Sequence, residues 1–187
     1  MPNSNRRELM VGAAALFGSS LLAPLARAAE AVGTPAGFTA SRALFTPEQR
    51  ALVAALSERI IPTTDTPGAI AAGVPSFIEM MMADWYEPTD RNEFMAGLGV
   101  LDGYARVRYT RPFAGLNPEA QDAVLTLAME NAVPGLARTF FEHCRQMVIL
   151  GYYSSEIGCK QERIYLPVPG RYDGAYPYAE VRRVFSS

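Results

Sequence analysis

The chain holds few of the side chains from which cofactor and metal sites are usually built. Its 187 residues include one histidine, His143, and two cysteines, Cys144 and Cys159. The sequence has no C-x-x-C pair, C-x-x-C-H haem attachment, H-E-x-x-H zinc motif or G-x-G-x-x-G dinucleotide loop. We therefore expect this chain to hold neither a cofactor nor a metal ion by itself.

The adjacent pair His143-Cys144 suggests a thiol nucleophile beside its base. Neighbours on a helix point about 100° apart and do not share a proton easily, so we interpret the pair as a helix residue next to a buried or bridged thiol. Cys144 and Cys159 are 15 residues apart. Two alternatives fit this spacing: a disulfide, stabilising by roughly 3 kcal/mol through loop closure, or two free thiols, one of them facing a partner.

The charged residues do not select a chemistry either. Asp65, Asp84 and Asp102 are candidates for acid–base work, but nothing in their spacing picks a pair. The formal net charge is −2, from 17 basic and 19 acidic residues, and no basic block lies beyond the first few residues. The electrostatic footprint of a nucleic-acid-binding protein is therefore missing.

Residues 1–28 are typical of an export signal. The pair Arg6-Arg7 precedes an uncharged apolar run over residues 9–26, and Ala26 and Ala28 form an A-x-A cleavage site. The adjacent arginines resemble the twin-arginine signal, which exports proteins that have already folded. We expect a periplasmic protein whose signal is cleaved after Ala28; a retained N-terminal anchor is the alternative.

Five stretches with helical spacing of apolar residues follow a small-residue linker over residues 29–43. They cover residues 46–61, 75–86, 90–107, 117–129 and 134–151, and several begin with a capping residue and a proline. A turn-rich loop, residues 62–74, joins the first two and is long enough to be functional. We predict an all-α bundle of about five helices in a single domain, residues 44–187, with the last long helix at its centre.

The chain ends in an irregular extension, residues 151–187, which is rich in Tyr, Pro and Gly. Six of the nine tyrosines lie in this extension. Tyrosine buries apolar area while its polar tip stays hydrogen-bonded, and proline favours extended backbone. Because such a segment is costly to order, it either wraps its own helices or docks onto a second protein.

Several short motifs resemble the gluconate 2-dehydrogenase subunit 3 family. They are T-P-E-Q-R from Thr46, I-I-P-T from Ile60, P-G-A-I-A-A-G-V-P from Pro67, G-Y-Y-S-S-E-I-G from Gly151 and V-P-G-R-Y-D-G from Val168. The resemblance spans about residues 44–178, and the last two motifs are specific to the family.

The resemblance implies a small, non-catalytic subunit of a periplasmic dehydrogenase complex, located at the periplasmic face of the inner membrane or in solution. The large partner, of the glucose-methanol-choline (GMC) oxidoreductase type, would carry FAD and oxidise a sugar, sugar acid or alditol, and a cytochrome c subunit would carry haem c. The small subunit would assist folding of the FAD subunit and escort it through the twin-arginine route.

The resemblance carries over no catalytic residue. It implies that the loop 62–74 and the extension dock the partner, with the extension's contacts at Tyr152, Tyr153, Glu156, Tyr165, Pro167, Pro169, Arg171, Tyr172 and Tyr176. The alternative function is a stand-alone exported binding or envelope-structural module.

Overall fold

The computed structural model describes residues 38–165 together with residues 170, 177, 179, 182 and 184–186. Contacts divide the chain into two units, Met1–Pro35 and Ala36–Ser187, and every described residue belongs to the second. The predicted export signal, with Arg6, Arg7, Ala26 and Ala28, lies outside the described residues.

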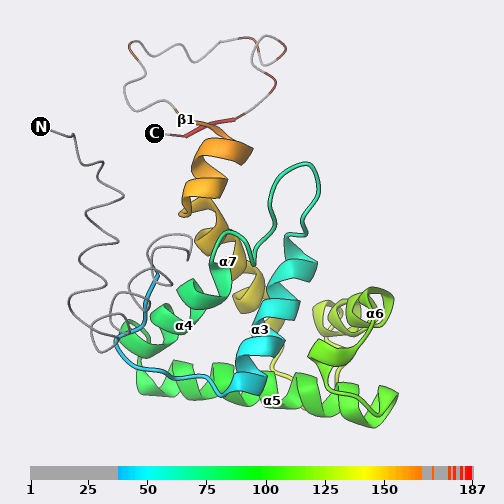
Figure 1. Ribbon diagram of the computed structural model, residues 1–187. Helices are drawn as coiled ribbons and strands as arrows, with labels where there is room; N and C mark the ends of the chain where they lie inside the picture. The colour runs from blue at the N-terminus through cyan, green and yellow to red at the C-terminus, as the bar shows by residue number, and fades with distance from the viewer. Residues whose placement is uncertain are drawn as a thin grey trace, which may run out of the picture. The chain divides into compact units, whose positions relative to one another are not determined.

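The described part of the chain is helical, which confirms the all-α prediction. The α-helices are α3 Pro47–Ile60, α4 Val74–Asp84, α5 Pro88–Tyr109, α6 Pro118–Met129 and α7 Phe140–Tyr153 (Figure 1). Two short helical turns accompany them, the 3-10 helix η2 Phe113–Gly115 and the π-helix η3 Gly158–Glu162. One parallel pair of two-residue strands, β1 Ile164–Tyr165 and β2 Phe185–Ser186, follows.

At two of the predicted helix starts, the structure contains the capping hydrogen bonds that the sequence indicates. The Thr46 hydroxyl accepts a hydrogen bond from the Gln49 amide, and the Gln49 side chain accepts one from the Thr46 amide, a complete capping box. At α6, the Asn117 side chain accepts a hydrogen bond from the Ala120 amide. Both helices have proline at the first helical position, where its missing N–H has no cost.

Two other predicted boundaries are wrong. The third helix begins at Pro88 instead of residue 90, because proline in the first turn already has the helical φ angle. The fifth begins at Phe140 instead of residue 134. Gly135 adopts φ = 78°, a left-handed conformation that an α-helix does not contain, so residues 134–139 form turns.

The core lies where α3, α4, α5, α6 and α7 meet. Its largest fully buried side chains include Val53, Ile78, Met82, Leu98, Leu101, Phe113, Val124, Val148 and Tyr152. Helix α7 packs against α3, α4 and α6. The prediction that it is the buried centre of the bundle is wrong, because its outer face is open to solvent and Leu150 there is 52% exposed.

Part of the predicted linker is fixed to α4. The Phe38 ring packs edge-on against Phe77, with 4.9 Å between centroids, and the Ser41 amide donates to the Asp84 carboxylate at 3.0 Å. The Ser41 hydroxyl donates to the same carboxylate. Residues 38–46 therefore belong structurally to the helical unit.

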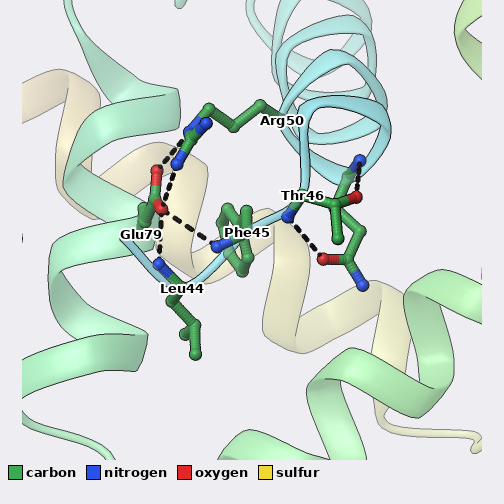
Figure 2. A network of polar contacts seen from close by, with 6 residues as sticks. Leu44, Phe45, Thr46, Arg50 and Glu79 are labelled. Carbon is green, nitrogen blue, oxygen red and sulfur yellow. Dashed lines mark hydrogen bonds and ion pairs between the residues drawn. The ribbon is translucent and has the colours of Figure 1, made fainter. Parts of the chain in front are cut away.

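The strongest of these attachments is made by Glu79 (Figure 2), and we call it the Glu79 clamp. Its Oε1 accepts hydrogen bonds from the Leu44 and Phe45 amides at 2.8 and 3.0 Å. Arg50 donates to both carboxylate oxygens, at 2.8 and 2.9 Å. One side chain of α4 thus satisfies the backbone that leads into α3 and pairs with a side chain of α3 itself.

Candidate docking surface

The loop between α3 and α4, residues 62–73, is held in shape by Glu58, near the end of α3. Glu58 Oε1 accepts hydrogen bonds from the Thr63 amide and hydroxyl at 2.9 and 2.7 Å, and its Oε2 accepts one from the Ile70 amide at 2.9 Å. We call this arrangement the Glu58 clamp. Burial acts to raise the pKa of Glu58, but these hydrogen bonds outweigh it and lower the pKa below its ordinary value.

Two glycines make this loop geometry attainable. A Cβ atom at Gly68 would collide with the Glu58 carboxylate and the Thr63 backbone nitrogen. Gly73, immediately before α4, has φ = 75°, which side-chain-bearing residues rarely adopt. Both glycines belong to the motif that begins at Pro67, so the geometry accounts for part of that motif.

The loop is joined to the chain segment that follows α7. The Tyr152 hydroxyl donates to the Pro67 carbonyl at 2.9 Å, and the Thr66 hydroxyl donates to Glu162 in η3 at 2.8 Å. These contacts join residues that are 85 and 96 positions apart in the sequence. The motif from Pro67 and the motif from Gly151 therefore form one structural unit.

The turn after α7 is shaped by its own motif residues. The Ser155 hydroxyl donates to the Tyr152 carbonyl at 2.6 Å and accepts from the Gly158 amide at 3.0 Å. A Cβ atom at Gly158 would collide with the same carbonyl. Ser155 and Gly158 thus turn the chain tightly at the end of α7, which brings η3 beside the loop.

A polar pocket of about 270 Å³ opens between the loop and this segment. It is lined by Asp65, Thr66, Tyr153, Glu162, Arg163, Arg182 and Val184. A second hollow, of about 210 Å³, shares Thr66, Tyr153 and Glu162 with the first. The Arg163 guanidinium lies over the Tyr153 ring, 4.1 Å from its centroid, so both side chains are held in place at the surface.

We call loop 62–73 together with residues 153–165 the docking surface. It combines one arginine, Arg163, with carboxylates, tyrosines and backbone positions that are fixed by internal hydrogen bonds. Tyrosine and arginine are the side chains enriched at protein interfaces, and a surface fixed in advance loses little entropy on binding. The arrangement is therefore suited to recognition of a protein.

Comparison with protein families identifies the chain. The family model described as gluconate 2-dehydrogenase subunit 3 matches residues 47–170, more than half of the 187 residues. The chain belongs to this family. The match includes the whole of the docking surface. Comparisons with curated proteins and with solved structures found no match.

Membership in the gluconate 2-dehydrogenase subunit 3 family confirms the predicted resemblance. The family description names a subunit of gluconate 2-dehydrogenase, which supports a small-subunit role and, in general terms, a partner dehydrogenase subunit.

The predicted docking residues of this family member have different environments. Tyr152 is 2% exposed and lies in the core, on the buried face of α7. Its prediction as a partner contact is therefore wrong. Tyr153 is half-buried beneath Arg163, and Glu156 is exposed and pairs with Lys160 at 2.8 Å. Tyr165 is 44% exposed. Pro167, Pro169, Arg171, Tyr172 and Tyr176 lie outside the described residues.

Of the two alternatives for Cys144 and Cys159, the disulfide is not formed. Cys144 is buried on the core face of α7, where burial raises the pKa of its thiol. The Cys159 thiol donates to the Tyr153 carbonyl, at the end of α7. Positions 144 and 153 are nine positions apart in α7, a rise of about 14 Å along the helix axis. The Cys159 thiol, which lies at the Tyr153 carbonyl, is therefore at the far end of the helix from Cys144. This rise is more than the roughly 7 Å between Cα atoms that a disulfide can span.

His143 is paired with a tyrosine and not with its cysteine neighbour. Its Nε2 lies 2.8 Å from the Tyr86 hydroxyl, which also contacts the Met147 sulfur at 3.4 Å. The His143 ring meets the Phe94 ring edge-on. Burial lowers the pKa of His143, so the neutral imidazole is favoured at pH 7. The interpretation of His143 as a helix residue beside a buried thiol is confirmed.

The candidate acid–base carboxylates have separate structural partners. Asp84 accepts hydrogen bonds from Ser41, and Asp102 accepts them from the Phe113 amide and from Arg106. Asp65 lines the polar pocket. Within the described residues, no group of three or more His, Cys, Asp or Glu side chains is arranged to hold a metal ion. The helices of this same part of the chain include none with the length and apolar character to cross a membrane.

Sequence reasoning missed three residues that shape the docking surface: Glu58, Thr66 and Glu162. Their contacts reach across 5 to 96 positions of the chain, and no motif pairs the residues involved. The available signal was indirect: Thr66 directly precedes the motif from Pro67, and Glu162 lies four residues after the end of the motif from Gly151.

Proposed function

We propose that the chain is the non-catalytic small subunit of an exported FAD-dependent dehydrogenase complex. Its large partner is of the GMC type, carries FAD and oxidises a sugar, sugar acid or alditol. A cytochrome c subunit with haem c takes the electrons onward. Family membership supports the general part of this proposal, a dehydrogenase subunit as partner.

The observation that carries the proposal is the union of the two family motifs in the docking surface. The Tyr152–Pro67 and Thr66–Glu162 hydrogen bonds fix the loop against the segment after α7. Long ordered loops within a compact domain usually have a function of their own. Arg163, Tyr153 and carboxylate side chains held beside this fixed loop fit the recognition of a protein surface.

The chemistry-bearing side chains support a non-catalytic role. Glu58 and Glu79 are occupied by backbone amides, Asp102 by η2 and its arginine, and His143 by Tyr86. Each of these groups joins two segments of the fold. Side chains that are committed to structural hydrogen bonds are poorly placed to move protons in a reaction.

The export part of the proposal rests on residues 1–28, with Arg6-Arg7 as the twin-arginine pair and Ala26 and Ala28 at the cleavage site. The signal continues into a segment that Glu79 and Asp84 hold against α4. One chain therefore carries both the signal and the docking surface. A folded flavoprotein bound to that surface is exported together with it into the periplasm.

Co-purification from the native host tests this proposal. The tagged chain should bring down a flavoprotein, visible as flavin absorbance, and a haem protein from the periplasm and membranes. The purified chain alone should show no flavin absorbance and no turnover. Replacing Arg6 and Arg7 by lysine should leave this chain and the flavoprotein in the cytoplasm. A colourless single band in the periplasm would favour the exported binding or envelope-structural module instead.

The docking surface has its own test in the same complex. Arg163→Ala removes the guanidinium above Tyr153, and we expect it to weaken binding of the flavoprotein about ten-fold. The matched control is Arg138→Ala, an exposed arginine outside the docking surface. Equal affinities for the two variants, measured by titration of the purified partner, would place the interface elsewhere on the chain.

A further inference from the structure

A third hollow, which is mainly apolar, lies at the N-terminal end of α3. It has a volume of about 240 Å³ and is enclosed by α3, α5 and the segment of η2. Leu52 and Leu98, which are 3% and 1% exposed, lie at its base. The remaining lining residues are Glu48, Gln49, Ala51, Gly99, Asp102, Arg106, Pro112 and Ala114. The small residues among them, two alanines and a glycine, leave the space open.

The walls of this pocket are fixed by hydrogen bonds. Asp102 accepts from the Phe113 amide at 2.8 Å and from Arg106 Nε at 2.6 Å, which ties η2 to α5. Phe113 is fully buried, and its carbonyl accepts a hydrogen bond from the Gln121 side chain at 3.1 Å. The pocket is therefore preformed, and its occupant does not have to order the walls.

Size decides what kind of occupant fits. Pockets for cofactors and drug-sized ligands usually measure about 300–1,000 Å³, so this one is small for them. It is large enough for a single bulky apolar side chain, the kind of anchor that dominates protein interfaces when it fills a pocket. A hollow that opens to solvent suits a side chain presented from another protein surface.

The charged residues that line the pocket indicate what should lie beside that side chain. The rim carries Glu48 and Asp102 against Arg106, a net charge of −1. Asp102 and Arg106 are paired with one another, so the net negative charge is centred on Glu48. A basic residue beside the apolar anchor would complement this rim.

We propose that the pocket between α3, α5 and η2 receives one large apolar side chain, flanked by a basic residue, from the partner dehydrogenase subunit. This inference rests on the proposed function. It adds a second contact to the docking surface: the pocket is lined by residues near the N-terminal end of α3, whereas the loop 62–73 follows the C-terminal end of this helix (Figure 1). The 14 residues of α3 extend over about 21 Å, a separation that a standard protein interface covers.

Gly99 provides a direct way to close the pocket. It lines the hollow, and a Cβ atom built there meets no atom within 4 Å. Gly99→Leu should fill the space without a clash and also favour the helix. Gly103 lies one turn further along α5, has equally open space and does not line the pocket, so Gly103→Leu is the matched control.

The affinity of the purified flavoprotein for each variant is the measurement, with thermal unfolding to confirm that both variants fold. We expect Gly99→Leu to raise Kd about 30-fold, as loss of a hot-spot contact does, and Gly103→Leu to leave it unchanged. Unchanged affinity for Gly99→Leu overturns the pocket proposal while the proposed function stands. Absence of any complex with the unaltered chain overturns the proposed function itself.

Other occupants give different results. If Gly99→Leu lowers the melting temperature of the purified chain and Gly103→Leu does not, residues of this chain fill the pocket and the proposal is wrong. A small molecule that native mass spectrometry finds on the unaltered chain but not on Gly99→Leu also overturns it.

The rim is tested by charge reversal at two equivalent positions. Glu48 and Glu119 each follow the proline that begins their helix, and only Glu48 lines the pocket. Glu48→Lys should raise Kd about three-fold, mainly through slower association that depends on salt, whereas Glu119→Lys should not. Equal effects of the two reversals would remove the basic residue from the proposal.

Discussion

Two glutamates hold the chain at the two ends of α3, and they do so in different ways. Glu79 binds the amides of Leu44 and Phe45, before the helix, and forms a two-pronged pair with Arg50. Glu58 binds the loop after the helix through two amides and one hydroxyl. The Glu79 clamp thus has a cationic partner in direct contact, whereas the hydrogen-bond donors of the Glu58 clamp are all neutral.

The two carboxylates differ accordingly in electrostatics. Arg50, followed by the two amides, lowers the pKa of Glu79 from 4.5 to about 2 against the opposing effect of burial. For Glu58 burial is the largest influence and acts in the opposite direction, and the hydrogen bonds lower its pKa less far. The charged form is therefore held more firmly at Glu79, which is 8% exposed.

This difference matches the tasks of the two ends. The Glu79 clamp fixes the segment through which the chain enters the helical unit. The Glu58 clamp fixes a loop of the docking surface through hydrogen bonds at exposed positions. A stronger attachment at one end and a weaker one at the other is a testable description of the molecule.

The largest expected effect is that of Glu79→Ala. The change leaves the buried Phe45 amide, the Leu44 amide and Arg50 without their acceptor, and we expect the free energy of unfolding to fall by about 3 kcal/mol. Urea unfolding of the purified chain measures this. Glu93→Ala, at an exposed position on α5, is the control and should change little. A loss below about 1 kcal/mol for Glu79→Ala would show that the attachment is no firmer than a surface contact.

A smaller effect is expected from acid. Because the pKa of Glu79 is lower in the folded chain, its contribution is fully present above about pH 4.5 and is lost as the pH falls toward about 2. Allowing for screening around the half-exposed Arg50, we expect it to amount to on the order of 2 kcal/mol.

Unfolding curves of the unaltered chain and of Glu79→Gln, recorded between pH 7 and pH 2.5, isolate this part. The stability gap between them should shrink as the pH falls through that window. A constant gap would mean that the carboxylate charge contributes nothing to the clamp.

Much of the fold could be predicted from the sequence, because helices leave local signals. The capping box at Thr46 and the cap at Asn117 each involve only four consecutive residues. The spacing of apolar residues predicts all five α-helices of the described chain. The predicted start of α7 is wrong because Gly135 adopts a left-handed conformation. A glycine in the sequence does not by itself show which conformation the tertiary structure will select.

The docking surface was only partly predictable. Composition pointed to the loop and the extension, but it could not separate Tyr152 from Tyr153, because adjacent residues of one helix face different environments. Neither clamp was predicted. The Glu79 contacts span 29 to 35 positions, and no local pattern connects a glutamate to amides that far away.

The smallest effect, and the sharpest test of the comparison, is that of Glu58→Ala. It removes hydrogen bonds near the surface, so we expect a global loss of only about 1 kcal/mol. The local effect should be clear: the Thr63 and Ile70 amides lose their acceptor and should exchange with solvent deuterium much faster, while the core of α5 and α7 exchanges as before. Hydrogen exchange followed by mass spectrometry resolves the two regions. Faster exchange throughout the chain would mean that Glu58 is as structural as Glu79, and the two ends of α3 would then not differ.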